Sequence, residues 1–172
     1  GFIDERDETF IGYSDIPENT YALTLGCDYK SWGFSVMFQG VDHVSRYYDA
    51  EAMFAFINGG KVREHHLDRW NPISSEAENL AYAKYPLLHY SGNGDHNQRS
   101  NSFFLKNGSF IRLKNIELSY SLPQSWIKKA GMTNCRLYVN ANNLITWDHL
   151  DDLCDPESNG SNRYPIMKTV NF

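Results

Sequence analysis

The fold of this chain is decided by the stretch Asn107-Gly-Ser-Phe-Ile-Arg-Leu-Lys-Asn-Ile-Glu-Leu-Ser-Tyr-Ser-Leu-Pro123. From Lys114 onward apolar and polar residues alternate, with Ile116, Leu118, Tyr120 and Leu122 opposite Asn115, Glu117, Ser119 and Ser121. A period of two predicts a β-strand with one apolar and one polar face. Ile111 and Leu113 are apolar in the opposite phase, which predicts a bulge or a change of environment near Lys114. Pro123 ends the strand because it has no N–H for a ladder.

Alternation recurs on both sides of this strand. Residues 21–29 alternate most clearly, with apolar side chains on one face and a Tyr at each end of that face, which fits an apolar band between two interfacial rings. After a tight turn at 30–33, Phe34, Val36 and Phe38 form the returning strand of an antiparallel hairpin. A short helical connector at 123–131 leads to a further strand. We expect five strands, at 20–29, 33–40, 110–122, 135–147 and 164–172.

Two polar segments separate these strands. Residues 41–109 show no sustained strand pattern, although Glu51–Ile57 is predicted to form a short helix, and residues 148–163 form a second polar loop. Structureless insertions as long as the first are rare in compact soluble domains. Long loops on the outer face are the rule in outer-membrane barrels.

Composition narrows the class of protein. The chain has 172 residues and is 41% hydrophobic, enough for a sizeable core, yet no run of about eighteen apolar residues could form a transmembrane helix. Its negative mean hydropathy still allows a membrane barrel, because only alternate residues of such a strand meet lipid. A net charge of −5 argues against a nucleic-acid partner. The three cysteines, Cys27, Cys135 and Cys154, are expected to be free thiols, buried or facing lipid.

Candidate metal and catalytic residues are few. Gly1–Asp7 is similar to the second half of a calcium loop in which Asp4 and Asp7 supply ligands, although an acidic surface turn explains it equally well. His65, His66, His89 and His96 lack ligand spacing and are expected to be solvent-exposed loop residues. No nucleophile motif, phosphate-binding loop or singled-out carboxylate pair is present, so we expect no enzyme activity.

Several motifs resemble one family over nearly the whole chain. They are Gly12–Pro17 with Thr20-Tyr21, Phe38-Gln-Gly40, Ser109–Asn115, Leu122-Pro123, Arg136-Leu-Tyr-Val139, Asn142-Asn-Leu144, Asp155-Pro-Glu157 and Tyr164-Pro165. Together they look like the C-terminal part of SusC/RagA-type TonB-linked outer-membrane proteins (TonB-dependent receptors).

The resemblance implies an all-β fold, the last five strands of an antiparallel transmembrane barrel of about 22 strands. Residues 1–172 would then be the C-terminal part of the barrel, and 41–109 a long extracellular loop. It also implies import of oligosaccharides or peptides across the Gram-negative outer membrane, a SusD-like surface lipoprotein as lid, and TonB contact through an N-terminal region with the plug, both absent here. The chain is expected to be cut from a longer one, with a final strand shorter than the family's. No cofactor is expected, except calcium in the full-length protein.

The expected barrel topology assigns each connector to one side of the membrane and each strand residue to the lipid or to the lumen. If the last strand runs inward, connectors 30–33 and 123–134 are periplasmic, and 41–109 and 148–163 are external. Lipid is then expected to contact Tyr21, Leu23, Leu25, Phe34, Val36, Leu118 and Tyr120. The lumen or plug is expected to contact Asp28, Gln39, Glu117, Asn140 and Asn142.

Loop aromatic residues could stack on sugar rings or on the lid protein, or could pack only within the loop. This set is Tyr47, Tyr48, Phe54, Trp70 and Tyr90, of which Trp70, Tyr47 and Tyr90 are the candidate substrate-binding residues.

Two other functions stay open at this point. A soluble carbohydrate-binding β-sandwich would bury both apolar faces in a closed core. A glycosidase domain would hold two carboxyl groups about 5–10 Å apart in a cleft. A barrel segment instead predicts an open, curved antiparallel sheet with an exposed apolar face.

Overall fold

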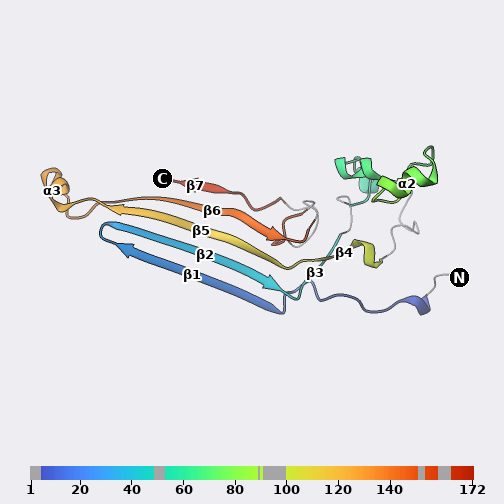
Figure 1. Ribbon diagram of the computed structural model, residues 1–172, viewed down its shortest axis with the longest axis horizontal. Helices are drawn as coiled ribbons and strands as arrows, with labels where there is room; N and C mark the ends of the chain where they lie inside the picture. Colours follow the sequence, from blue (N-terminus) through green and yellow to red (C-terminus); the bar gives the residue numbers. More distant parts are fainter. Residues whose placement is uncertain (1–4, 49–52, 89, 91–99, 151–153, 159–163) are drawn as a thin grey trace.

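A five-stranded antiparallel sheet forms the body of the molecule. The computed structural model describes residues 5–48, 53–88, 90, 100–150, 154–158 and 164–172. The sheet has the order β1-β2-β5-β6-β7, so each strand lies beside the next one of the sheet along the chain (Figure 1). Its strands are β1 (Asn19–Tyr29), β2 (Trp32–Asp42), β5 (Phe110–Ser121), β6 (Arg136–Asp148) and β7 (Thr169–Asn171). The edge strands β1 and β7 are not paired with each other, and the sheet is therefore open.

The five predicted strands are all present, and four of them begin and end within two residues of the prediction. The last one is wrong in length, because β7 covers only Thr169–Asn171 of the expected 164–172. β7 pairs with β6 only from Asn140 to Asn142. The next residue of β6, Asn143, has a left-handed backbone with φ of 55°, and this interrupts the edge to which residues 164–168 would have paired.

The bulge predicted near Lys114 is confirmed. On β2, Met37 pairs with Asn115 and Phe38 pairs with Leu113, so Lys114 has no partner in that ladder. The β5–β6 ladder shifts register at the same place. The extra residue keeps Leu113 and Ile116 on one face although they are three positions apart.

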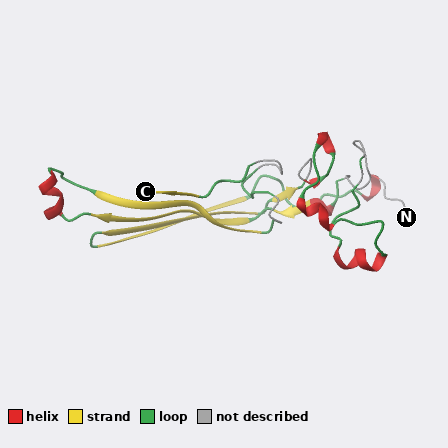
Figure 2. Ribbon diagram, turned by 90° about the horizontal axis from the view of Figure 1, so that it is seen from above, coloured by secondary structure: helices red, strands yellow, loops and turns green. Residues whose placement is uncertain are grey.

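The connectors divide between the two ends of the sheet. The turn at 30–31 and the connector with α3 (Gln124–Ile127) and the 3₁₀-helix η6 (Lys128–Ala130) lie at one end (Figure 1). The two long connectors lie at the other end, together with the N-terminal segment that contains η1 (Glu5–Asp7) (Figure 2). The predicted grouping of short with short and long with long is confirmed. In the described residues, no helix is long and apolar enough to span a bilayer.

The long connector 43–109 is a small folded unit. It contains β3 (Ser45–Tyr47) paired with β4 (Leu105–Asn107), the helix α2 (Glu76–Tyr82), and the 3₁₀-helices η2 (Ile57–Gly59), η3 (Glu64–Asp68) and η5 (Ser102–Phe104). The prediction that this segment lacks strands is therefore wrong at β3 and β4, which are too short to show an alternation. Residues 51 and 52 of the predicted helix Glu51–Ile57 lie outside the described residues, and Ile57 belongs to η2.

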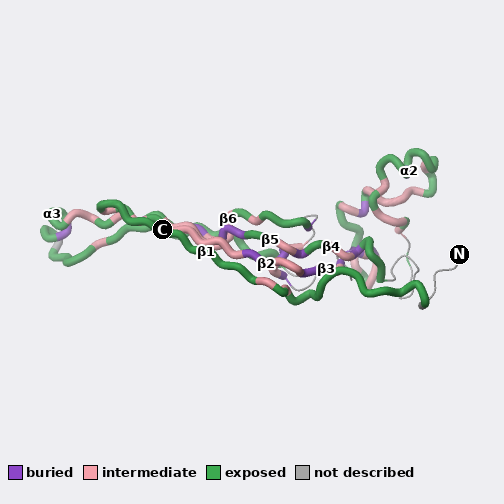
Figure 3. The backbone as a smooth tube through the Cα atoms, turned by 60° about the horizontal axis from the view of Figure 1, so that its bottom comes forward, coloured by how far each residue is buried: buried purple, intermediate pink, exposed green. Residues whose placement is uncertain are grey.

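The loop unit and the second long connector share a small hydrophobic core. Tyr48, Met53 and Phe104 are buried together with Leu150 from the second long connector, and Phe54 and Cys154 pack against them. Buried residues gather near this junction of sheet and loops, whereas much of the sheet is exposed (Figure 3). The core thus joins the two long connectors to each other.

Candidate functional site

The register of the strands builds one continuous apolar face. Directly paired residues of antiparallel strands share a face. The two end rows are Tyr21, Gly40, Ile111 and Trp147 near the loops, and Tyr29, Trp32, Tyr120 and Leu137 at the opposite end. The three middle rows are Leu23, Phe38, Leu113 and Ile145; Leu25, Val36, Ile116 and Ala141; and Cys27, Phe34, Leu118 and Val139. Tyr and Trp, the rings with a polar group, therefore occur only in the end rows.

Most residues of this apolar face are exposed, whereas Leu113 and Ala141 in its middle rows are only 8% exposed. Leu25 on the edge strand β1 is 53% exposed, and Phe34 and Leu118 on the inner strands β2 and β5 are 40% and 48% exposed. Within the described residues no second layer packs on them. The soluble β-sandwich predicts a closed core at this place, so the geometry counts against it. Tyr21 and Tyr29 are eight residues apart, about 26 Å along a strand. With a tilt of about 40° the height is about 20 Å, comparable to the apolar band of about 25 Å on outer-membrane barrels.

The opposite face of the sheet is polar and hydrogen-bonded across strands. The Asn115 amide donates to Asn142 Oδ1 at 2.9 Å, and Asn171 donates to Asn140 Oδ1 at 2.9 Å. Arg136 forms an ion pair with Glu117 and donates to Ser119 Oγ. The residues predicted for the wet set thus share one face of the sheet, opposite the apolar rows.

Gly33 allows two polar groups to approach each other on this face. A Cβ at Gly33 would lie 2.8 Å from Asp28 Oδ1 and 2.7 Å from Ser119 Oγ, closer than side-chain atoms tolerate. The Ser119 hydroxyl lies 3.3 Å from the Gly33 carbonyl oxygen, to which it donates. A residue with a side chain at position 33 would separate these neighbours.

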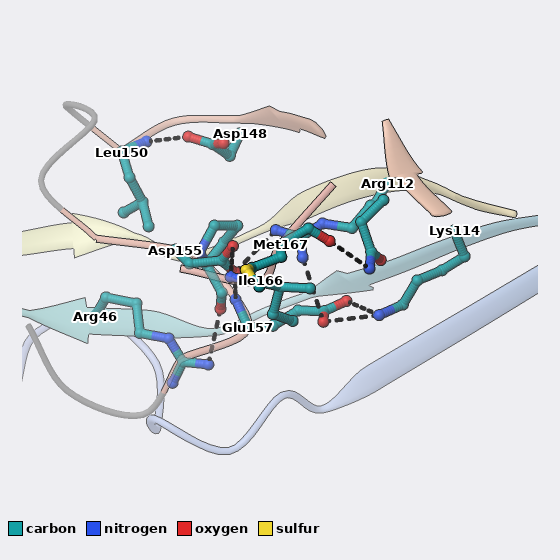
Figure 4. A network of polar contacts seen from close by, with 11 residues as sticks. Arg46, Arg112, Lys114, Asp148, Leu150, Asp155, Glu157, Ile166 and Met167 are labelled. Atoms are coloured by element: carbon teal, nitrogen blue, oxygen red, sulfur yellow. Dashed lines mark hydrogen bonds and ion pairs between the residues drawn. The ribbon is translucent and has the colours of Figure 1, made fainter. Parts of the chain in front are cut away.

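A buried ion-pair cluster lies on the polar face near the loop end (Figure 4). Arg112 Nη2 donates to Asp155 Oδ1 at 2.8 Å, and the side chains of Arg112 and Asp155 are 2% and 6% exposed. Glu157 lies 3.4 Å from Arg112 Nη1 and 2.7 Å from Lys114 Nζ. The motif Asp155-Pro-Glu157 contributed to the family resemblance, but the sequence did not assign these residues a structural role. The pairing was not predicted, because the partners come from segments 43 positions apart.

Trp70 lines an open cleft of about 640 Å³ in the loop unit. The other lining residues are Ala83, Lys84, Tyr85, Pro86, Leu87, Asn101, Phe103 and Phe104. The backbone N–H of Trp70 donates to the Tyr85 carbonyl oxygen at 2.8 Å, and the Tyr85 and Phe103 rings meet edge to face at 6.1 Å. This cleft has the apolar, aromatic lining typical of ligand sites.

The other two candidate aromatic residues lie elsewhere. Tyr47 packs against the loop core, with its ring 6.3 Å from that of Phe104. Tyr90 is 87% exposed and lies 5.9 Å from the Phe56 ring. The structure therefore does not gather Trp70, Tyr47 and Tyr90 in one site, and ligand binding at each of them stays a prediction.

The four loop histidines were expected to be solvent-exposed, and this prediction is wrong for His66. His66 is 1% exposed; its Nδ1 accepts from the Arg63 N–H at 2.9 Å, and its Nε2 lies 2.8 Å from the Met53 carbonyl oxygen. The His65 ring lies 4.0 Å from the His66 ring and is tilted by 44° to it. Burial, with the neighbouring His66 and Arg63, lowers the pKa of His65. His66 thus has a structural role, while His89 and His96 lie outside the described residues.

No group of three or more His, Cys, Asp or Glu in the described part of the chain could hold a metal ion. Asp4 lies outside that part, and Asp7 ends η1, so the calcium site at Asp4 and Asp7 stays a prediction. Cys27, Cys135 and Cys154 are free thiols, as expected, with Cys27 on the apolar face. Burial raises the pKa of the Cys154 thiol.

Comparison with curated proteins finds two receptors from Formosa agariphila. TonB-dependent receptor P26 is 26% identical over 168 residues, which are 96% of this chain and 16% of that receptor. TonB-dependent receptor P3 is 40% identical over 65 residues, which are 38% of this chain and 6% of that receptor. The chain thus spans about one sixth of the length of TonB-dependent receptor P26. No family model matches this chain.

Comparison with solved structures finds the RagAB peptide importer. In its closed-closed state the match has a TM-score of 0.69 at 26% identity and covers 97% of this chain and 18% of that chain. In the open-open state the TM-score is 0.62 with the same identity and coverage. Sequence and fold together confirm the expected resemblance: over nearly its whole length this chain is similar to TonB-dependent receptors and to the RagAB importer.

Proposed function

We propose that this chain is part of the wall of an outer-membrane TonB-dependent transporter, the last five strands of a barrel of about 22. The observation that carries the proposal is the five-row apolar face, with Tyr and Trp confined to its end rows. In a bilayer, backbone groups at an open sheet edge would be unsatisfied, and a closed barrel is the sheet structure that satisfies all of them. The open edges of β1 and β7 would then pair with other strands of the same barrel.

The lengths of the connectors indicate which end of the proposed barrel wall faces the periplasm and which faces the cell exterior. Barrels of this kind have short periplasmic turns and longer extracellular loops. The end with α3 would therefore face the periplasm, and the loop unit with α2 would face the cell exterior (Figure 1). Asp7, the described residue of the proposed calcium loop, would also lie on the exterior side.

The proposed cargo is an oligosaccharide or a peptide, imported with a SusD-like lipoprotein as lid and with TonB acting through a region outside this chain. Similarity to the RagAB peptide importer supports the transport role. The cleft beside Trp70 offers rings for stacking on cargo or lid. Leu67, Ile73 and Leu80 are 67%, 93% and 73% exposed on the same loop unit, and they offer an apolar contact surface to a lid. The chain itself would catalyse no reaction.

A pair of single cysteines tests the placement in the membrane. In a full-length receptor without its native cysteines, Glu76→Cys on α2 should react in intact cells with a maleimide that cannot cross membranes. Lys129→Cys, at the opposite end, should react only after the outer membrane is permeabilised. Equal labelling of both in intact cells, or recovery of the receptor in the soluble fraction, would exclude the barrel. Uptake of labelled peptides and oligosaccharides by the same cells then distinguishes the two cargo classes.

A further inference from the structure

The bulge at Lys114 places a second cation beside Arg112. Arg112 occupies a polar-face row with Gln39 and Thr146. Because Lys114 is the extra residue of the bulge, both Lys114 and Asn115 can serve the polar face while Leu113 and Ile116 stay on the apolar face. The phase slip in the sequence therefore adds a positive charge to the polar face without adding one to the apolar face.

These two cations hold the segment Cys154–Ser158, here called the strap, against the polar face. The Asp155 carboxylate accepts from Arg112 Nη2, from the Glu157 N–H at 2.9 Å and from the Ile166 N–H at 3.1 Å. Glu157 pairs with Lys114 at 2.7 Å. Asp155, Pro156 and Ser158 are buried. An exposed ion pair would hold a segment weakly, whereas loss of one partner from a buried pair leaves an uncompensated charge.

The strap is also hydrogen-bonded to the loop unit, through Arg46. Arg46 of β3 donates from Nη2 to the Pro156 carbonyl oxygen at 3.3 Å and from Nη1 to the Asp15 carbonyl oxygen at 2.6 Å. Figure 4 shows Arg46 reaching the strap from the side opposite to Arg112. The strap is therefore held both to the sheet and to the loop unit, and it does not lie free at the end of the sheet.

We infer that the strap is a fixed constriction at the outer mouth of the channel, and that the cluster of Arg112, Lys114, Asp155 and Glu157 sets the largest cargo that passes. The inference rests on the proposed function, since only in a barrel does the polar face become the channel wall. A segment bound on that wall occupies cross-section that cargo would otherwise use. The carboxylates that hold it also remove the charge of the two cations from the lining.

Release of the strap can be measured at a native thiol. Cys154 is partly buried in the strap, so the rate of its reaction with a membrane-impermeant maleimide reports opening. In the full-length receptor carrying Cys27→Ala and Cys135→Ala, Glu157→Gln should speed this reaction roughly a hundredfold, because it leaves Lys114 unpaired and removes one carboxylate from Arg112. Glu117→Gln is the matched control, since it removes a carboxylate that pairs with Arg136 on the same face, about 10 Å along β5 from Lys114.

The size limit is measured as uptake of long relative to short labelled cargo in energised cells. We expect the ratio to rise several-fold in Glu157→Gln and to stay unchanged in Glu117→Gln. Faster Cys154 labelling with an unchanged ratio of long to short cargo would overturn the role of the strap as a constriction. Unchanged labelling would show that the ion-pair cluster does not hold the strap in place. If no cargo of any length enters through the unmodified receptor, the proposed function fails. Cys154 labelling still reports whether the ion-pair cluster holds the strap.

A second variant guards against misfolding. Arg112→Gln with Asp155→Asn removes both charges of the most buried pair, a change that is often tolerated when both partners go together. It should also raise the uptake ratio. Absence of this variant and of Glu157→Gln from the outer membrane would show that the cluster serves assembly, and would overturn its role in size selection.

Discussion

The sharpest prediction concerns one strand and three of its residues. Leu25 lies in the middle row of the apolar face, Tyr21 lies in an end row, and Thr24 lies on the polar face of the same strand, β1. Each is replaced by Arg in the full-length receptor. The three variants share a strand and a charge and differ only in depth and face, so each serves as a control for the others.

The expected cost follows from depth in the bilayer. Leu25 is four residues from each end row, about 13 Å along the strand and about 10 Å in height at a tilt of 40°. Arg on the lipid face costs about 2–4 kcal/mol at the midplane and about 0–1 kcal/mol near the interface. Leu25→Arg should therefore lower the folding equilibrium constant by roughly 30-fold to 1000-fold, and Tyr21→Arg by less than about tenfold. Thr24→Arg should change it little, because that side chain faces the polar side.

The free energy of unfolding is obtained from denaturant titration of the receptor in lipid vesicles, followed by the loss of the folded band on gels run without heating. The expected order of cost is Leu25 above Tyr21 above Thr24. Equal costs at Leu25 and Tyr21 would show that depth has no effect. A cost at Thr24 as large as at Leu25 would show that both faces meet the same solvent, and the lipid-facing assignment would fail.

Four further predictions concern the loops and the N-terminal segment. Phe104→Ala should destabilise the loop unit by about 3–5 kcal/mol, because Phe104 is 2% exposed, and hydrogen exchange should rise there but not in β1 and β2. Ser75→Ala removes the cap of α2 and should cost about 1 kcal/mol in exchange protection of that helix. The Ser75 backbone N–H lowers the pKa of Glu78 below its ordinary 4.5, so this support is present above pH 4.5 and lost as pH falls through the lower folded-state value; exchange of α2 as a function of pH measures it. Asp7→Asn should weaken calcium binding by the full-length receptor at least tenfold in a titration, with Asp15→Asn unchanged.

Local chemistry explains why the strands were predictable. In a strand the direction of each side chain is set by the backbone, so the alternation at Tyr21–Tyr29 specifies the two faces without any knowledge of neighbours. The bulge at Lys114 was predictable for the same reason, since a phase slip leaves a mark in the sequence. The strands β3 and β4 left no such mark, because three residues are too few for a period.

The structure places the candidate binding residues apart from one another, and ligand binding at each of them stays a prediction. Trp70 lines a cleft, but Tyr47 packs on the loop core and Tyr90 stands apart from both. Aromatic content identified these residues as candidates, and it carried no information on which rings the chain would use for its own packing. Asp155 and Glu157 belonged to a recognised motif, yet nothing near them in the sequence indicates Arg112 and Lys114 as partners.

By itself, the sequence determined the four long strands, their two unlike faces, the bulge and the family resemblance, because each depends on residues a few positions apart. Only the tertiary structure decided that most of the apolar face is exposed, that the two long connectors share a core, and that the strap is bound to the polar face. Those features join residues tens of positions apart, and their stability comes from burial that exists only after the segments have met.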